Sequence, residues 1–254
     1  MAVTIFAGEF AASVGLSAKS LDTRQPLEGY SMEQIRGFLI RVALLAFILF
    51  IWWRVLNTPL SDVVNLFIIW GGILLTYPLV WLGKKILLKQ PTMSRVVWIT
   101  TIVHSGLGFT LGIPLILAVT TYQKKDGWVL PVPTEIGLVL VVLTGSALAL
   151  TVLNLALKGF GAPFFIALSR KLAADWLYAW TRNPMVLAAL AFFLSLGIWY
   201  QSVLFEVWLL ILFAPALVFF LRMYEEKELE VRFGASYLEY KSRTSMMFPR
   251  RPRH

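Results

Sequence analysis

Long apolar runs are the feature that most constrains the fold of this chain of 254 residues. A helix needs about 20 consecutive apolar residues to cross the hydrocarbon core of a membrane. Several runs approach this length, and the last two are separated only by Tyr200, Gln201 and Ser202. We therefore predict an all-α polytopic membrane protein with about six transmembrane helices, the last two of which form a tight helical hairpin. The predicted spans cover residues 37–56, 63–83, 96–121, 136–157, 185–199 and 203–221.

Composition supports the membrane prediction and limits the chemistry of the chain. Hydrophobic residues make up 58% of the chain and charged residues 15%, whereas soluble domains carry about 25% charged residues. The chain has no cysteine, and its two histidines are His104 and His254. These counts exclude a disulfide and a zinc-thiolate site, and they argue against a histidine metal cluster. We therefore predict no metal site.

The basic residues are distributed unequally between the two sides of the predicted spans. A net charge of +9 could indicate a nucleic-acid partner, but the positions of the charges indicate orientation in a membrane instead. With six spans, both termini lie on one side together with residues 84–95 and 158–184. Only Arg54, Lys124 and Lys125 then fall on the opposite side, which leaves 20 of the 23 Lys and Arg residues with the termini. By the positive-inside rule, we expect a plasma (inner) membrane protein with both termini in the cytoplasm and no nucleic-acid partner.

We predict three parts along the chain. Residues 1–35 mix apolar and polar side chains and form an N-terminal arm, which is either loosely held or lies on the membrane surface as an amphipathic segment. Residues 36–158 form a four-helix transmembrane region. Residues 159–254 form a C-terminal core that consists of a pre-hairpin segment, the helical hairpin and a tail.

His104 is the main polar candidate within the predicted spans. Ionisable residues inside a membrane are functional candidates by default, so His104 is a candidate contact for a substrate. The alternative is that His104 packs against a neighbouring helix together with Thr100, Thr101 and Ser105. The usual sequence signs of a transporter or channel, such as a ladder of carboxylates or a matched pair of broken spans, are missing.

Polar residues gather on both sides of the predicted hairpin. Arg182 and Asn183 precede it, and Glu225 and Glu226 follow it. Because a turn of three residues brings the two arms side by side, we expect Arg182 and Glu225 to meet at the same membrane depth. Together these residues would form an opening at the end of the hairpin that is lined by a cation, an amide and paired carboxylates. Such an opening suits a polar, zwitterionic cofactor from the cytosol and a lipophilic reactant from the bilayer. The alternative is that these residues only mark helix ends and pair with one another.

Short motifs follow one another in order through the last third of the chain. They are Gly-Phe-Gly-Ala-Pro at 159–163, the segment 172–178, Arg-Asn-Pro-Met at 182–185, the hairpin, Tyr-Glu-Glu-Lys-Glu-Leu-Glu at 224–230, Phe-Gly at 233–234, Tyr237, Tyr240 and Pro249. In this order and spacing, the sequence resembles the isoprenylcysteine carboxyl methyltransferase and phospholipid methyltransferase superfamily of membrane enzymes, especially its short bacterial and archaeal members. The resemblance covers roughly residues 159–250.

The resemblance implies a methyltransferase that uses S-adenosylmethionine and releases S-adenosylhomocysteine, with residues 159–254 as its methyltransferase-like core. It places the cofactor near the cytoplasmic end of the hairpin. The cofactor-binding residues that it implies are Arg182, Asn183, Pro184, Glu225 and Glu226, with Tyr178 and Leu229 as candidates for the wall around the adenine.

The same resemblance suggests which residues act on the methyl acceptor. Arg182 and Glu226 are the candidate catalytic residues, and the preferred role of Arg182 is to hold an anionic acceptor with both arms of its guanidinium. Trp176 and His104 are candidate substrate contacts. Relatives usually have Gly-Pro where this chain has Trp176 and Leu177, so we expect the turn there to lack the same backbone freedom.

These features predict transfer of a methyl group to a carboxylate or thiol of a small lipophilic acceptor, either a small molecule or a membrane lipid. The rival enzymatic functions are a phospholipid amine methyltransferase, a small-thiol methyltransferase and, more remotely, a sterol-type reductase that uses a nicotinamide. A non-catalytic scaffold or transporter subunit with an altered site is an alternative of a different class. Cofactor binding separates these classes, because a reductase would bind a nicotinamide and a scaffold would bind neither cofactor.

Overall fold

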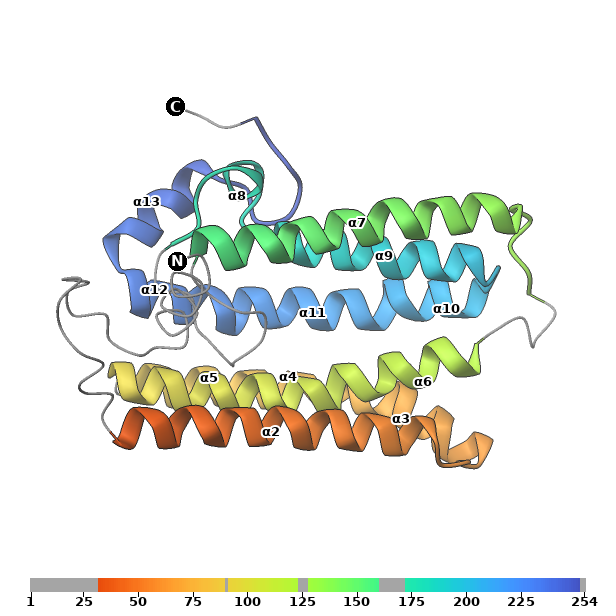
Figure 1. The fold of residues 1–254 in the computed structure, drawn as a ribbon, viewed down its shortest axis with the longest axis horizontal. Coiled ribbons are helices and arrows are strands. Elements are labelled where there is room, and N and C mark those ends of the chain that lie inside the picture. Colours follow the sequence, from red (N-terminus) through yellow and green to blue (C-terminus); the bar gives the residue numbers. More distant parts are fainter. Residues whose placement is uncertain (1–31, 90, 123–127, 160–171, 252–254) are drawn as a thin grey trace, which may run out of the picture.

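A computed structural model describes residues 32–89, 91–122, 128–159 and 172–251. Within these ranges the regular elements are helices, which run alongside one another in a bundle (Figure 1). Five helical stretches are long and apolar enough to cross a membrane: Arg36–Leu56, Asp62–Lys89, Met93–Thr121, Thr134–Leu155 and Val203–Phe233. The sixth predicted span, Pro184–Trp199, is also an apolar helix but a shorter one. The prediction of an all-α polytopic membrane protein is therefore confirmed.

Several of these stretches consist of more than one element. The first three stretches contain α2 (Met32–Leu56), α3 (Asp62–Leu74), α4 (Thr76–Lys89), α5 (Met93–Leu107), the π-helical turn η1 (Gly108–Gly112) and α6 (Ile113–Thr121). They are followed by α7 (Thr134–Gly159), the single turn α8 (Leu177–Trp180) and α9 (Pro184–Trp199). The last long stretch contains α10 (Val203–Trp208), the π-helical turn η2 (Leu209–Phe213), α11 (Ala214–Phe220), the π-helical turn η3 (Leu221–Glu225) and α12 (Glu226–Phe233), and α13 (Ala235–Arg243) comes after it.

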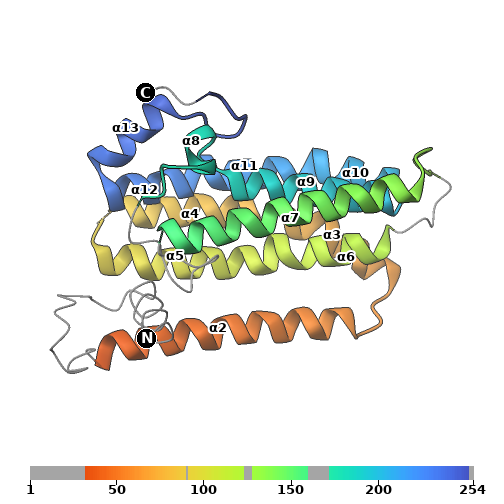
Figure 2. The ribbon, with the colours of Figure 1, turned by 45° about the horizontal axis from the view of Figure 1, so that its top comes forward.

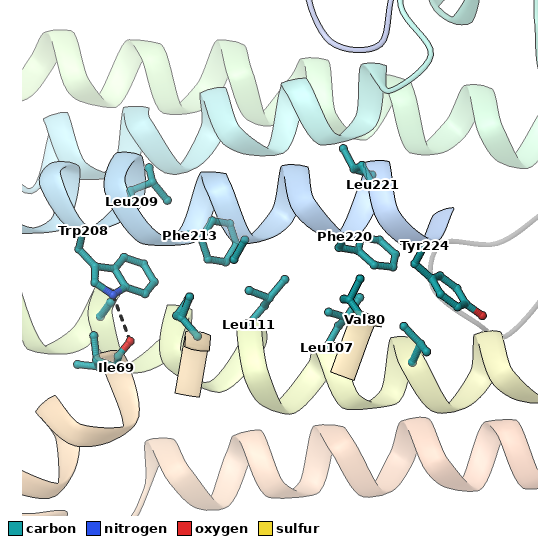
Figure 3. Packing of buried hydrophobic residues seen from close by; sticks show 14 of the residues in the cluster. Ile69, Val80, Leu107, Leu111, Trp208, Leu209, Phe213, Phe220, Leu221 and Tyr224 are labelled. Carbon is teal, nitrogen blue, oxygen red and sulfur yellow. Dashed lines mark hydrogen bonds between the residues drawn. The ribbon is translucent and has the colours of Figure 1, made fainter. Parts of the chain in front are cut away.

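The long C-terminal stretch packs against the N-terminal spans through a buried apolar cluster (Figure 3). The indole Nε1 of Trp208 donates a hydrogen bond to the carbonyl oxygen of Ile69 at 3.2 Å. Nearer the other end, the hydroxyls of Thr100 and Tyr224 are 3.0 Å apart. A Cβ atom on Gly83 would lie 2.4 Å from a side-chain carbon of Val103, so the small glycine allows the close packing that membrane helices need. These contacts fix the position of η3 and α12.

The turn between α9 and α10 is as short as predicted. Gln201 has a left-handed backbone with φ 55°, and its carbonyl oxygen accepts a hydrogen bond from the backbone N–H of Leu130 at 3.0 Å. The hydroxyl of Ser202 accepts a hydrogen bond from the N–H of Phe205 and caps α10. The loop before α7 therefore holds the turn, and the prediction of a tight hairpin is confirmed.

Helices α7 and α9 lie side by side in both views of the ribbon (Figures 1 and 2). A Cβ atom on Gly137 would lie only 2.4 Å from the Cα of Trp199, so the backbones approach closely there. Further along, the hydroxyl of Thr144 donates to that of Ser195 at 3.2 Å. The start of α9, which carries the predicted site, is thereby held against α7.

Two predicted features fall largely or wholly outside the described residues. The N-terminal arm, residues 1–35, is described only from residue 32 onward. Residues 160–163 of the Gly-Phe-Gly-Ala-Pro motif also lie outside the described ranges.

Candidate active site

The predicted site residues lie mainly at one end of the bundle, where α8, α12, α13 and the start of α9 come together (Figures 1 and 2). We call this the site end. Segments from distant parts of the sequence meet here, because the hairpin of α9 and α10 returns the chain to the end from which it started. The C-terminal residues then fold back over α8.

Arg182 links three of these segments. Its Nη1 atom donates to the carbonyl oxygens of Lys241 at 2.9 Å and Thr244 at 2.7 Å, which lie at the end of α13. Its Nη2 atom donates to a carboxylate oxygen of Glu226. The last carbonyls of a helix lack partners within the helix, so a guanidinium satisfies them and also complements the negative end of the helix dipole. Arg182 therefore ties α13 to the start of α12.

The expectation that Arg182 meets Glu225 is wrong, because the partner of Arg182 is Glu226. The physical reason lies in η3, which ends at Glu225. A π-helical turn holds an extra residue, so it rotates the following side chains by about 100° relative to a regular α-helix. The predicted membrane depth of Arg182 and the acidic residues was correct. The local helix geometry then determined that Glu226, and not the adjacent Glu225, faces Arg182.

The remaining glutamates of the acidic run differ in their partners. Glu226 also accepts a charged contact from the Nζ of Lys241 at 2.6 Å. Glu228 is paired with Arg232 one helical turn away at 2.9 Å, and both side chains are buried. Glu230 contacts Lys227 at 2.6 Å and Lys241 at 2.9 Å.

Glu225 is the exception in this run. It has no hydrogen bond and no ion pair within residues 172–251 or the other described ranges. Burial alone would lower the pKa of the neighbouring Lys241, but its hydrogen bonds to Glu226 and Glu230 raise the pKa above the usual value for lysine. Lys241 therefore stays charged and committed to those two carboxylates, which leaves Glu225 available for a ligand.

The C-terminal tail, residues 244–251, is hydrogen-bonded to the Arg-Asn-Pro segment at 182–184 and to Thr181. The backbone N–H of Arg182 donates to the carbonyl of Ser245 at 2.8 Å. The side-chain amide of Asn183 donates to the carbonyl of Met246 at 3.0 Å, and the hydroxyl of Thr181 donates to the same oxygen at 3.0 Å. The conformation at the start of α9 therefore depends on residues that lie more than 60 positions later in the chain.

Tyr178 and Tyr240 fix α8 against α13. The hydroxyl of Tyr240 donates to the carbonyl oxygen of Tyr178 at 2.6 Å. Burial, together with the neighbouring Tyr178, raises the pKa of Tyr240, so its hydroxyl keeps the proton that this hydrogen bond needs. The ring of Tyr178 is buried as well. Both rings are held in place and can form part of a wall.

Trp176 adopts a backbone conformation that normally belongs to glycine. Its φ is 56° and its ψ is −121°, and the N–H of Tyr178 donates to the carbonyl of Asp175 at 3.1 Å across the turn. These angles match the first central residue of a type II′ turn, where glycine is preferred. The expectation that Trp176 and Leu177 deny the turn this backbone conformation is therefore wrong. The chain keeps the turn and accepts strain at Trp176.

We predict that Trp176→Gly stabilises the protein by about 1 kcal/mol. Glycine removes the steric cost of a positive φ, roughly 1–2 kcal/mol, but it also gives the unfolded chain more conformational entropy, which offsets part of this gain. The indole is 69% exposed, so little packing is lost. Thermal unfolding in detergent measures the change. Trp176→Ala keeps the Cβ and should not stabilise, and Gly234→Ala, at φ 54° with open space around it, should destabilise. A fall in stability with Trp176→Gly would show that the ring has a packing role.

The other predicted residues take different positions. Pro184 is the buried first residue of α9, and Leu229 is half-buried on α12. His104 lies in α5, where its Nδ1 is 2.9 Å from the carbonyl of Thr100 and its ring meets the edge of Phe220 at a centroid distance of 5.3 Å. The structure thus places His104 in a packing contact within the membrane part of the bundle.

Comparison with family models shows what kind of domain carries this geometry. Residues 133–236 match the model of the phospholipid methyltransferase family. These residues form a phospholipid methyltransferase domain. The search of curated proteins and the search of solved structures found no match. The chain is thus a membrane methyltransferase in general terms, and the resemblance to this superfamily is confirmed.

The methyltransferase domain begins before α7 and ends within the first turn of α13. It therefore includes α7, which precedes the part of the chain covered by the resemblance, and it contains Arg182, Glu225 and Glu226. Lys241 and Thr244, which bind the Arg182–Glu226 pair, lie beyond it. Sequence reasoning missed these two residues, because the backbone carbonyl of Thr244 and a lysine among the other basic residues near the C-terminus carry no local signal. Three ion pairs join residues three or four positions apart and could have been predicted from that spacing: Lys227–Glu230, Glu228–Arg232 and Glu239–Arg243.

Proposed function

We propose that this chain is an S-adenosylmethionine-dependent methyltransferase that acts on a lipophilic acceptor in the membrane. The observation that carries the proposal is the carboxylate of Glu225. It lies beside the Arg182–Glu226 pair in a methyltransferase domain, and it has no hydrogen bond or ion pair within the described residues. Methyltransferases of this family generally use S-adenosylmethionine.

The residues at the site fit this cofactor. A carboxylate accepts hydrogen bonds from an ammonium or from ribose hydroxyls, and it stabilises a nearby positive charge. The Nε of Arg182 is buried without a hydrogen-bond partner, so it is a donor for an anionic group. We propose that Glu225 is the main cofactor contact and that Tyr178, Asn183, Pro184 and Leu229 line the same site.

The protein contributes mainly by positioning. When bound, S-adenosylmethionine supplies an activated methyl group on a sulfonium, and S-adenosylhomocysteine is the product. Placing the acceptor in line with that methyl group and excluding water can supply most of the rate. We propose that Arg182 and Glu226 hold α12, α13 and the tail around the site. This differs from the acceptor clamp expected for Arg182, because both Nη atoms already bind protein oxygens.

Two acceptor classes remain in the proposal. A carboxylate or thiolate of a small lipophilic molecule attacks without a base, because it is already deprotonated. The amine of a phospholipid is the second candidate, and the description of the matched family favours it. An amine acceptor gives up a proton when the new carbon–nitrogen bond forms, so this class needs a proton acceptor at the site. Trp176 and His104 stay candidate contacts for the acceptor.

Calorimetry on the purified full-length protein in detergent tests the cofactor. We expect S-adenosylhomocysteine to bind and a nicotinamide dinucleotide not to bind. Transfer of a labelled methyl group is then measured with three acceptors: a lipophilic carboxylate, a lipophilic thiol and phosphatidylethanolamine. Absence of S-adenosylhomocysteine binding by folded protein would contradict the proposal, whereas the acceptor series only selects between the classes.

We further propose that the site end faces the cytoplasm, where the cofactor is made. The excess of Lys and Arg on the side of the termini supports this orientation. A reporter fused after Arg251 should be active only in the cytoplasm. A periplasmic reading would place the site on the wrong side of the membrane for a cytosolic cofactor.

A further inference from the structure

Asn154 is a buried polar residue of α7 whose side chain makes no hydrogen bond to the described residues. Its side chain is 2% exposed, and neither its amide nitrogen nor its amide oxygen makes a hydrogen bond in the described part of the chain. Nearby Thr151 is also buried, but its hydroxyl donates to the carbonyl of Leu148 at 2.7 Å within the same helix. Asn154 therefore differs from a buried polar residue that its own helix satisfies.

The packing of α7 on α9 sets the depth of Asn154. Gly145 faces Phe192, since a Cβ atom on this glycine would lie 3.3 Å from the phenylalanine ring. The helices are antiparallel, so moving nine residues along α7 (145 to 154) corresponds to moving nine residues back along α9 (192 to 183). Asn154 therefore lies level with Asn183 and the first turn of α9, at the site end of the bundle.

An unpaired carboxamide at this position is costly. A buried amide loses its hydrogen bonds to bulk water, and burial costs free energy when no protein group replaces them. The burial of Asn154 within one chain also excludes a contact with another membrane protein, which would need an exposed side chain. Buried polar groups without partners are rare in proteins and point to a ligand or to a functional site.

We infer that the carboxamide of Asn154 binds a polar group of the methyl-transfer reactants that presents a hydrogen-bond donor beside an acceptor. The edge of an adenine ring has this arrangement, and an asparagine side chain can pair with it through two hydrogen bonds. The polar head of the methyl acceptor could offer the same chemistry. This inference rests on the proposed function, and it makes Asn154 a binding residue of the site contributed by α7.

The test uses Asn154→Leu, which removes both polar atoms, with Asn154→Ala as a second variant in case leucine is too large. Binding of S-adenosylhomocysteine and of S-inosylhomocysteine, in which an oxygen replaces the adenine amino group, is measured by calorimetry. We expect wild-type protein to prefer S-adenosylhomocysteine and both variants to bind it about tenfold or more weakly, with that preference lost. If the acceptor is the ligand, both variants will instead raise its KM by a similar factor.

Thermal unfolding without ligand separates a ligand-binding role of Asn154 from a structural one. If Asn154 only stabilised the fold, replacing it would lower the unfolding temperature. We expect Asn154→Leu to unfold at the same or a higher temperature than the wild type, because it removes an unsatisfied buried amide. Thr151→Val, the matched control, should leave both ligand affinities within a few-fold. Unchanged cofactor affinity and acceptor KM in both variants, or a loss of stability in both, would overturn the inference. Failure of the wild type to bind S-adenosylhomocysteine would overturn the proposed function itself.

Discussion

Arg182→Lys is expected to weaken binding of S-adenosylhomocysteine by roughly tenfold to a hundredfold. A lysine keeps the charge but cannot reach the carbonyls of Lys241 and Thr244 and the carboxylate of Glu226 together, because it lacks the planar fork of the guanidinium. Hydrogen bonds that involve a charged group contribute about 1.5–3 kcal/mol each, which corresponds to this range of affinity. The tail should also loosen around the start of α9.

Two measurements on the same Arg182→Lys preparation separate a change in cofactor affinity from a change in docking of the tail. Calorimetry reports the cofactor affinity, and protease sensitivity of the tail reports whether residues 244–251 stay docked. Arg243→Lys is the matched control, because Arg243 makes a half-exposed contact with Glu239 at 3.7 Å and should change neither. A variant that binds the cofactor normally but transfers methyl groups poorly would favour the acceptor clamp over the positioning role.

Glu225→Gln is expected to lower the affinity for S-adenosylhomocysteine by about tenfold or more. The substitution keeps the size of the side chain but removes the charge that a cofactor ammonium would meet. Because Glu225 makes no ion pair within the described residues, its loss should break no ion pair of the protein. Thermal stability should therefore stay unchanged or rise slightly while binding falls.

Glu230→Gln is the comparison for this prediction. Glu230 belongs to the same acidic run but contacts Lys227 and Lys241 at a partly exposed position, so its charge is already compensated. We expect it to change the cofactor affinity by no more than a few-fold. Similar small effects of Glu225→Gln and Glu230→Gln would mean that the charge of Glu225 does not contribute to cofactor binding, and the assignment of Glu225 as the main cofactor contact would then be wrong.

The sequence could predict the positions of the spans and the end of the bundle at which Arg182 and Glu226 meet, because both depend on features that are local in the chain. Apolar length determines which segments can cross a membrane. The short turn at Tyr200–Ser202 determines that residues before α9 and after α11 return to the same end. The order of the motifs then predicted the family, and residues 133–236 match it.

Partner choice within the site could not be predicted in the same way. The extra residue in η3 rotates the helix that follows, so Glu226 and not Glu225 faces Arg182. Predicting the direction of a side chain from its position in a regular α-helix cannot account for the extra residue in this π-helical turn. Likewise, Trp176 has a positive φ in the turn that leads into α8, although tryptophan prefers other backbone conformations.

The sequence by itself determined a membrane bundle, a hairpin and the end of the bundle at which polar chemistry gathers. Only the tertiary structure shows that the carbonyls of Lys241 and Thr244 bind Arg182. It also shows that Glu225 makes no hydrogen bond or ion pair in the described residues, and that Asn154 lies buried at the same depth. The physical reason is that hydrophobicity and turn length act over a few residues, whereas hydrogen bonds between segments more than 60 residues apart are set only when the helices pack.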